Sequence, residues 1–191
     1  MAKFTYEEMK AHLDRWVEAN RAAGEKAEGW DKMYEFYTED ALYSWNYGPD
    51  KEFVARGQEQ IRDWAFGTEM AGLEEWRYRY IRTLIDPEKG EIVVFWRQQA
   101  PEEDPETGKP YEIVGTGGSW FRYAGNGKWS WQRDWFDLGN AVNCFVKMME
   151  NQHLSEGMQA RMDRQAKGVT PGWVPLQDFD WLATLEEPDD M

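Results

Sequence analysis

Three aromatic-rich segments of this 191-residue chain carry polar side chains at alternate positions. The segments cover residues 41–47, 91–99 and 128–138, and their composition is typical of β-strands. Alternate residues of a strand share one face, so each segment should present a face that mixes polar and aromatic groups. The three predicted faces hold Tyr43, Trp45 and Tyr47, then Phe95, Arg97 and Gln99, and finally Gln132, Asp134 and Phe136.

These faces could perform acid–base chemistry if the strands bring Asp134, Arg97 and Tyr43 together. Aromatic surroundings disfavour the charged form of a carboxylate, whereas a nearby guanidinium favours it. Asp134 could then remove a proton, Arg97 could hold a hydroxyl or a developing oxyanion, and Tyr43 could exchange a hydrogen bond with a hydroxyl. Such a set needs no cofactor and fits elimination, retro-aldol cleavage or isomerisation. The aromatic neighbours would suit a flat aromatic substrate.

Each of the three residues also has a structural interpretation. Asp134 could simply form a structural ion pair with Arg133 or Arg97. A perturbed pKa would not decide against this, because carboxylates in structural networks have perturbed pKa values as well. Arg97 could close an edge of the sheet with its long side chain. Tyr43 could be an ordinary core tyrosine. These alternatives stay open at the level of the sequence.

Tryptophan is unusually frequent, with 12 residues, which is more than a core of this size needs. Some of these rings should therefore line a cavity or an interface. If the face opposite Asp134 is convex, its indole rings are too apolar for water. That face predicts a homodimer through the sheet, and its residues are Trp129, Trp131 and Trp135.

The charge balance excludes several partners. The formal net charge is −14, from 22 basic and 36 acidic residues, which disfavours nucleic acid and anionic membrane surfaces.

Apolar runs stay well below the roughly 20 residues of a membrane-spanning helix, and the first residues contain no apolar signal core. A single cysteine, Cys144, cannot form an internal disulfide and fits a cytoplasmic protein. Two distant histidines, His12 and His153, exclude a histidine-rich metal site, and we predict no metal.

Two local motifs carry no recognisable chemistry. The glycine-rich run 115–118 lies in a predicted strand and opens no helix, so it does not resemble a phosphate-binding loop. Ser119 lacks the glycine pattern of a nucleophile elbow. His12 falls within a helical pattern and is interpreted as a surface or core residue. His153 is expected near a helix end, where it would interact favourably with the negative end of the helix dipole.

The order of predicted elements indicates an α+β fold. Thr5 and Glu8 form a capping box that starts a helix, and further helices are expected from Trp30 and over 57–66. A strand over 41–47 is followed by a meander over 76–85, 91–99, 111–123 and 128–138. Asn140 should cap a later helix and Ser155 should start another. Helices first and an antiparallel sheet later favour one α+β domain over 1–168, with an irregular tail over 169–191.

Two segments resemble a known superfamily. Residues 36–43, Phe-Tyr-Thr-Glu-Asp-Ala-Leu-Tyr, followed by Gly-Gln-Glu-Gln-Ile at 57–61, resemble the entry to the nuclear transport factor 2-like fold. Residues 132–138, Gln-Arg-Asp-Trp-Phe-Asp-Leu, resemble the last strand of its SnoaL-like and limonene-epoxide-hydrolase-like members. The resemblance implies a cone in which a curved antiparallel sheet wraps around a pocket closed by N-terminal helices.

The resemblance can be carried over residue by residue. Tyr43, Arg97 and Asp134 match the tyrosine, arginine and last-strand aspartate of the epoxide hydrolases. Trp45 replaces their asparagine and Gln99 replaces their second aspartate, so one of the two carboxylates that open the epoxide is missing. Trp45 also stands where steroid isomerases place a basic aspartate. SnoaL-like cyclases place a base near the position of Asp134.

The whole chain is similar to the SnoaL-like lignin-degradation lyases, which release formaldehyde from diarylpropane diols without a cofactor. The resemblance implies catalysis by Asp134, Arg97 and Tyr43. It implies a substrate pocket formed by Trp45, Tyr47, Phe95, Gln99, Gln132 and Phe136. Two alternatives remain: an epoxide hydrolase or polyketide cyclase/dehydratase, and a protein that binds a small ligand without catalysis.

Overall fold

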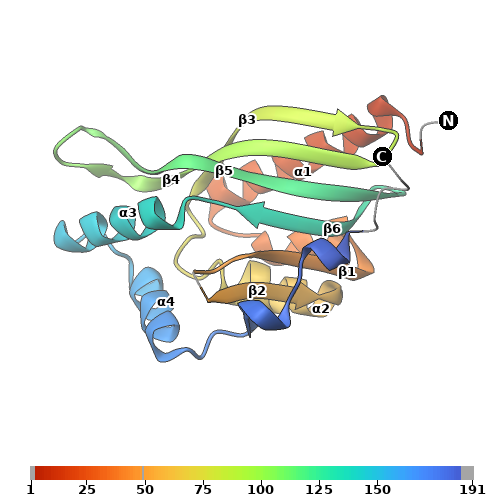
Figure 1. The fold of residues 1–191 in the computed structure, drawn as a ribbon. Coiled ribbons are helices and arrows are strands. Elements are labelled where there is room, and N and C mark those ends of the chain that lie inside the picture. Colours follow the sequence, from red (N-terminus) through yellow and green to blue (C-terminus); the bar gives the residue numbers. More distant parts are fainter. Residues whose placement is uncertain (1–2, 49, 186–191) are drawn as a thin grey trace.

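The fold is α+β, as predicted, and is built on one curved, unclosed sheet. The computed structural model describes residues 3–48 and 50–185, and within them seven strands pair in the order β3-β4-β5-β6-β1-β2-β7 (Figure 1). All neighbours are antiparallel except β1 and β6, which are parallel. The strands are β1 (Tyr37–Asn46), β2 (Lys51–Arg56), β3 (Arg77–Asp86), β4 (Glu91–Asp104), β5 (Lys109–Gly125), β6 (Lys128–Trp135) and β7 (Trp173–Pro175).

Helices pack against the inner side of this sheet and below the β4–β5 hairpin. The longest helix, α1, lies behind β3, β4 and β5 in Figure 1, while α3 and α4 lie below the long β4–β5 hairpin. The helices are α1 (Tyr6–Lys26), η1 (Trp30–Phe36), α2 (Gly57–Gln60), η2 (Ile61–Thr68), α3 (Leu138–Glu150), α4 (Glu156–Lys167), η3 (Leu176–Asp178) and η4 (Leu182–Thr184). The helix expected from Trp30 is thus a short 3-10 helix that passes directly into β1.

Helix α1 begins where its sequence predicts. The Thr5 hydroxyl accepts a hydrogen bond from the Glu8 amide at 3.1 Å and thereby caps the first turn. Met9, Leu13 and Trp16 recur at helical spacing and are buried against the sheet. The Trp16 indole also donates a hydrogen bond to the Tyr80 hydroxyl on β3 at 3.2 Å, which fixes the helix over the sheet.

The face of β4 that packs into the core is the opposite of the one predicted. Its buried residues are Ile92, Val94, Trp96, Gln98 and Ala100. The side chains of Phe95, Arg97 and Gln99 therefore lie on the outer side of the sheet, and the prediction that they face the pocket is wrong. The local pattern does not select a face, because Val93 and Phe95 make the other face apolar as well. In the folded chain the core takes Ile92, Val94 and Trp96.

Residues 169–185 are not simply the irregular tail that was expected over 169–191, and residues 186–191 lie outside the described residues. Strand β7 pairs with β2, and η3 and η4 lie in front of β1 and β2 in Figure 1. They cover a second apolar cluster on the outer side, formed by Leu42, Val54, Trp131 and Phe179. The Trp131 indole donates to the Thr184 hydroxyl at 2.9 Å. This part of the outer face is thus covered by the chain itself.

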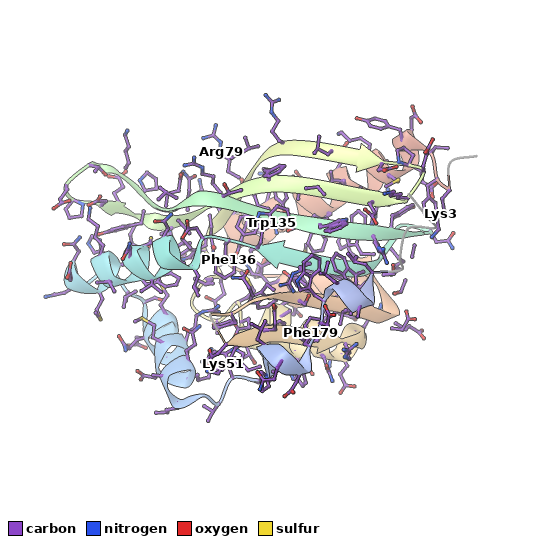
Figure 2. All side chains as sticks on the ribbon, in the orientation of Figure 1. Lys3, Lys51, Arg79, Trp135, Phe136 and Phe179 are labelled. Carbon is purple, nitrogen blue, oxygen red and sulfur yellow. The ribbon has the colours of Figure 1, made fainter. Side chains whose placement is uncertain are left out.

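The three tryptophans of β6 do not share one face. Register shifts between β5 and β6 turn Trp129 inward, where its ring lies 4.0 Å from the His12 ring of α1. Trp135 remains on the outer side, half-buried, with its ring 5.9 Å from that of Phe95 (Figure 2). Gly118 makes room for it, since a Cβ there would lie 2.2 Å from the Trp135 ring. A homodimer through the sheet stays a prediction, but only Trp135 of the three is left to serve it.

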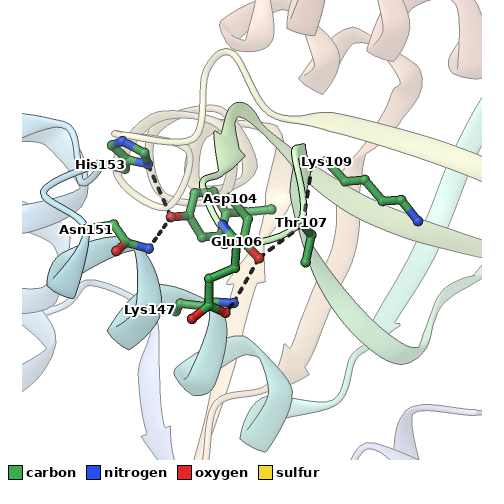
Figure 3. A network of polar contacts seen from close by, with 8 residues as sticks. Asp104, Glu106, Thr107, Lys109, Lys147, Asn151 and His153 are labelled. Atoms are coloured by element: carbon green, nitrogen blue, oxygen red, sulfur yellow. Dashed lines mark hydrogen bonds and ion pairs between the residues drawn. The ribbon is translucent and has the colours of Figure 1, made fainter.

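Helix α3 is tied to the β4–β5 hairpin by a polar network (Figure 3). The Lys147 ammonium contacts the carboxylates of Asp104 and Glu106, each at 2.8 Å. Beyond the helix end, Tyr111 contacts Asn151 at 2.7 Å and the His153 ring at 3.2 Å. His153 therefore bonds to a strand residue, which the helix-dipole interpretation did not anticipate.

Two local expectations need correction. Helix α3 is capped by Asp137, whose carboxylate accepts from the Asn140 amide at 3.0 Å, and Asn140 itself lies inside the helix. No element was predicted over residues 51–56, where the structure has strand β2. No helix among residues 3–48 and 50–185 has the length and apolar character needed to cross a membrane.

The buried His12 should make the fold acid-sensitive. Its ring is fully buried among Phe36, Tyr123 and Trp129. Burial, and then the charges of Arg15 and Lys128, lower the pKa of His12 to about 3. Between pH 6.5 and 3 the unfolded chain binds this proton and the folded chain does not, so the free energy of unfolding falls as the pH falls. The slope is about 1.4 kcal/mol per pH unit at most.

Denaturant unfolding between pH 7 and 4 measures this effect. We expect the variant His12→Phe to show a shallower loss of stability on acidification than the wild type, whatever its stability at pH 7. The comparison removes the contributions of the carboxylates, which titrate in both proteins. Parallel pH profiles of the two proteins would contradict a role for His12.

Candidate active site

Asp134 and Tyr43 meet on the inner side of the sheet because β1 and β6 are parallel neighbours. Trp45 lies opposite Asp134 in the ladder, and Tyr43 lies opposite Gln132. The Tyr43 hydroxyl donates a hydrogen bond to Asp134 Oδ2 at 2.6 Å, and Gln132 Nε2 donates to Asp134 Oδ1 at 2.7 Å. Both carboxylate oxygens are therefore held in place by neighbouring strand residues.

A cavity opens in front of this carboxylate. Its free space measures about 630 Å³, including the part that is open to solvent. Most of its wall is aromatic or aliphatic, and a few polar groups converge on it. The lining residues come from five strands of the sheet, from η2 and the segment after it, from the segment after β6, and from α3 and α4: Tyr43, Trp45, Ala65, Phe66, Glu69, Met70, Leu73, Tyr78, Trp96, Gln98, Ile113, Asp134, Phe136, Ala141, Phe145 and Arg161.

The environment of Asp134 favours proton uptake. Asp134 is half-buried and lies among the mostly aromatic and aliphatic residues of the cavity wall. Burial raises the pKa of Asp134 above its usual value, although hydrogen bonds from Gln132, Ser119 and Tyr43 partly offset this effect. Such a carboxylate is a stronger base than a solvated one.

Tyr43 acts as a hydrogen-bond donor in this arrangement. Burial, followed by the charge of Asp134, raises the pKa of Tyr43 well above its ordinary value. The phenol therefore keeps its proton at neutral pH and directs it to Asp134. A second buried phenol, Tyr37, donates to Gln132 Oε1. Gln132 in turn donates to Asp134, so its amide has a fixed orientation.

The structure brings together part of the predicted site. Of the nine residues, Tyr43, Trp45, Asp134 and Phe136 line the cavity. Two more stand directly behind the lining: Gln132 holds Asp134, and the Tyr47 hydroxyl lies 3.4 Å from Arg161.

Three predicted residues lie elsewhere. Arg97 and Gln99 are on the outer side, where Arg97 and the Gln99 amide both donate to Glu112. Phe95 packs against Trp135 on the same side. The predicted Asp134–Arg97 partnership is therefore wrong.

Several cavity residues were missed by sequence reasoning. Gln98 and Trp96 share the buried face of β4 with Ile92 and Val94. The sequence does not mark this face, because Val93 and Phe95 make the other face apolar too. Tyr78 lies on β3 and donates its hydroxyl towards Met70, while Gln98 donates to it at 3.0 Å. No local signal marks Glu69 or Arg161, because they come from a loop after η2 and from α4 and meet only in the folded chain.

The alternative that Asp134 is a partner of Arg133 is not supported by the geometry. Arg133 points to the other side of β6, where its guanidinium contacts the Glu52 carboxylate at 2.8 and 3.1 Å. Within residues 3–48 and 50–185, no group of three or more histidine, cysteine, aspartate or glutamate side chains lies close enough to bind a metal. The groups around Asp134 can transfer a proton and form hydrogen bonds.

Comparison with solved structures places the fold. PrhC from Penicillium brasilianum is 12% identical, with a TM-score of 0.57 over 81% of this chain and 95% of that one. A nuclear transport factor 2-like protein from Anabaena variabilis is 18% identical, with a TM-score of 0.52 over 72% and 95%. Bal32a from a soil-derived mobile gene cassette is also 18% identical, with a TM-score of 0.52 over 72% and 95%. At these identities the likeness concerns the fold alone.

Comparison of sequences places the family. No curated protein matches the chain significantly. The family model of the SnoaL-like domain matches residues 11–131, which is more than half of the chain and includes most of α1 and most of the sheet. Asp134, α3 and α4 lie beyond the matched residues. The chain therefore belongs to the SnoaL-like domain family.

Proposed function

We propose that this protein is a cofactor-independent lyase that acts on a hydrophobic aromatic alcohol. The observation that carries the proposal is Asp134, a carboxylate of raised pKa that is held by Tyr43 and Gln132 at the wall of an aromatic cavity. Catalytic bases are recognised by this combination of burial, fixed orientation and access to a pocket. The reaction we favour is deformylation of a lignin-derived diarylpropane diol to a stilbene.

The reaction balances without an oxidant or reductant. Asp134 removes the proton of the terminal hydroxyl, and the bond between that carbon and the central carbon breaks to release formaldehyde. The electron pair forms the new double bond and expels the benzylic hydroxyl, which leaves as water after it takes up one proton. Because one proton is released and one is consumed, the hydrogen-bonded pair of Asp134 and Tyr43 can return to its starting state.

The aromatic wall serves this reaction by orientation. Trp45, Phe66 and Trp96 line the cavity and could hold the two aryl rings coplanar with the developing double bond. Conjugation with the rings lowers the barrier only in that geometry. Positioning of this kind accelerates a reaction without any additional chemical group.

An assay on the purified protein tests the proposal. Incubation with a 1,2-diarylpropane-1,3-diol should release formaldehyde and stilbene in equal amounts, with the stilbene followed by its absorbance. The methyl ether of the terminal hydroxyl is the matched control, because it has no proton for Asp134 to remove and should give no product.

Other outcomes identify the alternative functions. Diol formation from a panel of epoxides would replace the proposal by epoxide hydrolysis, and cyclised or dehydrated polyketide-like products would replace it by a cyclase/dehydratase. Tight binding of the diol without product after long incubation would indicate a ligand-binding protein.

A further inference from the structure

A second charged pair lines the cavity that holds Asp134. The Arg161 Nη2 atom on α4 contacts Glu69 Oε2 at 2.7 Å, and a second guanidinium nitrogen donates to the backbone oxygen of Glu69. The two side chains are only 13% and 3% exposed, respectively. A buried ion pair is expensive to desolvate, and it is tolerated when its remaining polar atoms find partners.

Two atoms of this pair have no partner among the described residues. They are Glu69 Oε1, which can only accept a hydrogen bond, and Arg161 Nε, which can only donate one. Leaving such atoms unsatisfied in the interior costs free energy. An acceptor and a donor on the same rigid pair match a group that both donates and accepts, and a hydroxyl is the simplest such group.

Neighbouring residues fix the pair in place. The Tyr47 hydroxyl lies 3.4 Å from Arg161 Nη2, and burial raises the pKa of Tyr47, so it remains a protonated phenol. Arg164 on the same helix donates to the Thr68 backbone oxygen at 2.9 Å. Helix α4 is thus anchored over the end of η2, and the position of Arg161 does not depend on a mobile side chain alone.

The pair is chemically distinct from the Asp134 end of the cavity. Tyr78 lines the same cavity, and its hydroxyl accepts a hydrogen bond from Gln98 at 3.0 Å rather than from either end. No hydrogen bond links Glu69 or Arg161 to Asp134 or Tyr43 among the contacts of the described residues. One end can therefore perform proton transfer while the other recognises a different part of the ligand.

We infer that Glu69 and Arg161 form a hydroxyl-binding subsite that selects aromatic ligands carrying a free phenolic hydroxyl. The phenol would donate to Glu69 Oε1 and accept from Arg161 Nε. A methyl ether lacks the proton for Glu69, and a carboxylate would be repelled by Glu69 and by Asp134. This inference rests on the proposed function, which assigns the reacting end of the same ligand to Asp134.

Calorimetric titration with 4-ethylphenol and its methyl ether, 4-ethylanisole, tests the subsite directly. In the wild-type protein the phenol should bind at least about tenfold more tightly, because a site built for a hydroxyl is left unpaired by an analogue that lacks it. Equal affinities, or no binding of either probe, would overturn the inference. The measurement needs no turnover, so it stands apart from the lyase assay: a phenol preference without formaldehyde release would refute the reaction only.

Two variants locate the preference in the cavity. In Glu69→Leu/Arg161→Met both charges are removed, which avoids leaving one buried charge unpaired; the affinity ratio of the two probes should fall to about one. Asp134→Asn changes the other end and should keep the ratio. Loss of the preference in Asp134→Asn but not in the double variant would place phenol recognition at Asp134 and overturn the assignment. If the double variant does not fold, two measurements still test the subsite: the affinity ratio of the two probes in the wild type, and the same ratio in Asp134→Asn.

Discussion

The substitution Asp134→Asn should lower kcat for diol deformylation by about 10²- to 10⁴-fold, the usual contribution of a positioned base. Asparagine has nearly the same shape as aspartate and can keep one hydrogen bond with Tyr43 and one with Gln132. It cannot accept a proton from the substrate. The loss should therefore appear in kcat, with KM changed much less, and steady-state formaldehyde release measures both.

Stability separates this role from a structural one. Because burial raises the pKa of Asp134, its charged form is less favourable in the folded chain than in the unfolded chain. Removal of that charge should leave the free energy of unfolding at pH 7 unchanged or slightly higher. A matched control is Asp14→Asn, which alters a carboxylate that is 59% exposed on α1 and should affect neither property. A destabilised Asp134→Asn variant with wild-type turnover would contradict the proposed role.

The pH profile supplies an independent check on the same residue. Asp134 must be ionised to act as a base, and its pKa is raised. The acidic limb of kcat/KM should consequently lie above the ordinary aspartate value, and activity should increase as the pH rises through it. A limb at or below that value would assign the base to another group.

The second large effect concerns the Glu52–Arg133 pair on the outer side of the sheet. Glu52→Leu should lower the free energy of unfolding by about 3–5 kcal/mol, the typical cost when one partner of a buried ion pair is removed. The side chains of Glu52 and Arg133 are 3% and 11% exposed, and two hydrogen bonds join them. The Arg133 guanidinium also lies 4.7 Å from the centre of the Trp181 ring, beneath η4.

Urea unfolding of three proteins tests this prediction. The double variant Glu52→Leu/Arg133→Met should recover most of the loss, because it leaves no unpaired charge. The exposed pair of Lys10 and Asp14 provides the control: Lys10→Gln should cost less than about 0.5 kcal/mol. A loss below 1 kcal/mol for Glu52→Leu would mean that water reaches Arg133 and that the C-terminal segment does not seal this face.

That sealing role connects the C-terminal segment with the predicted homodimer. Trp131 was expected to be available to a second copy, yet the chain covers it with its own residues 173–185. The difference arises because an apolar outer face must be covered, but the sequence does not say which surface will cover it. Here the cover is the chain's own C-terminal segment, which adds Phe179 and Trp181 to the apolar cluster.

The sequence by itself determined the α+β class, the first helix with its Thr5 cap, the strands that carry Tyr43 and Asp134, and the fact that these two share one face of their strands. These features depend on local periodicity and on capping chemistry, which are properties of neighbouring residues. Tertiary structure decided which face of β4 is buried, so that Arg97 lies outside and Gln98 inside. It also brought Glu69 into contact with Arg161. Either face of an alternating strand is compatible with its local pattern, and only competition among all apolar residues for one core selects between them.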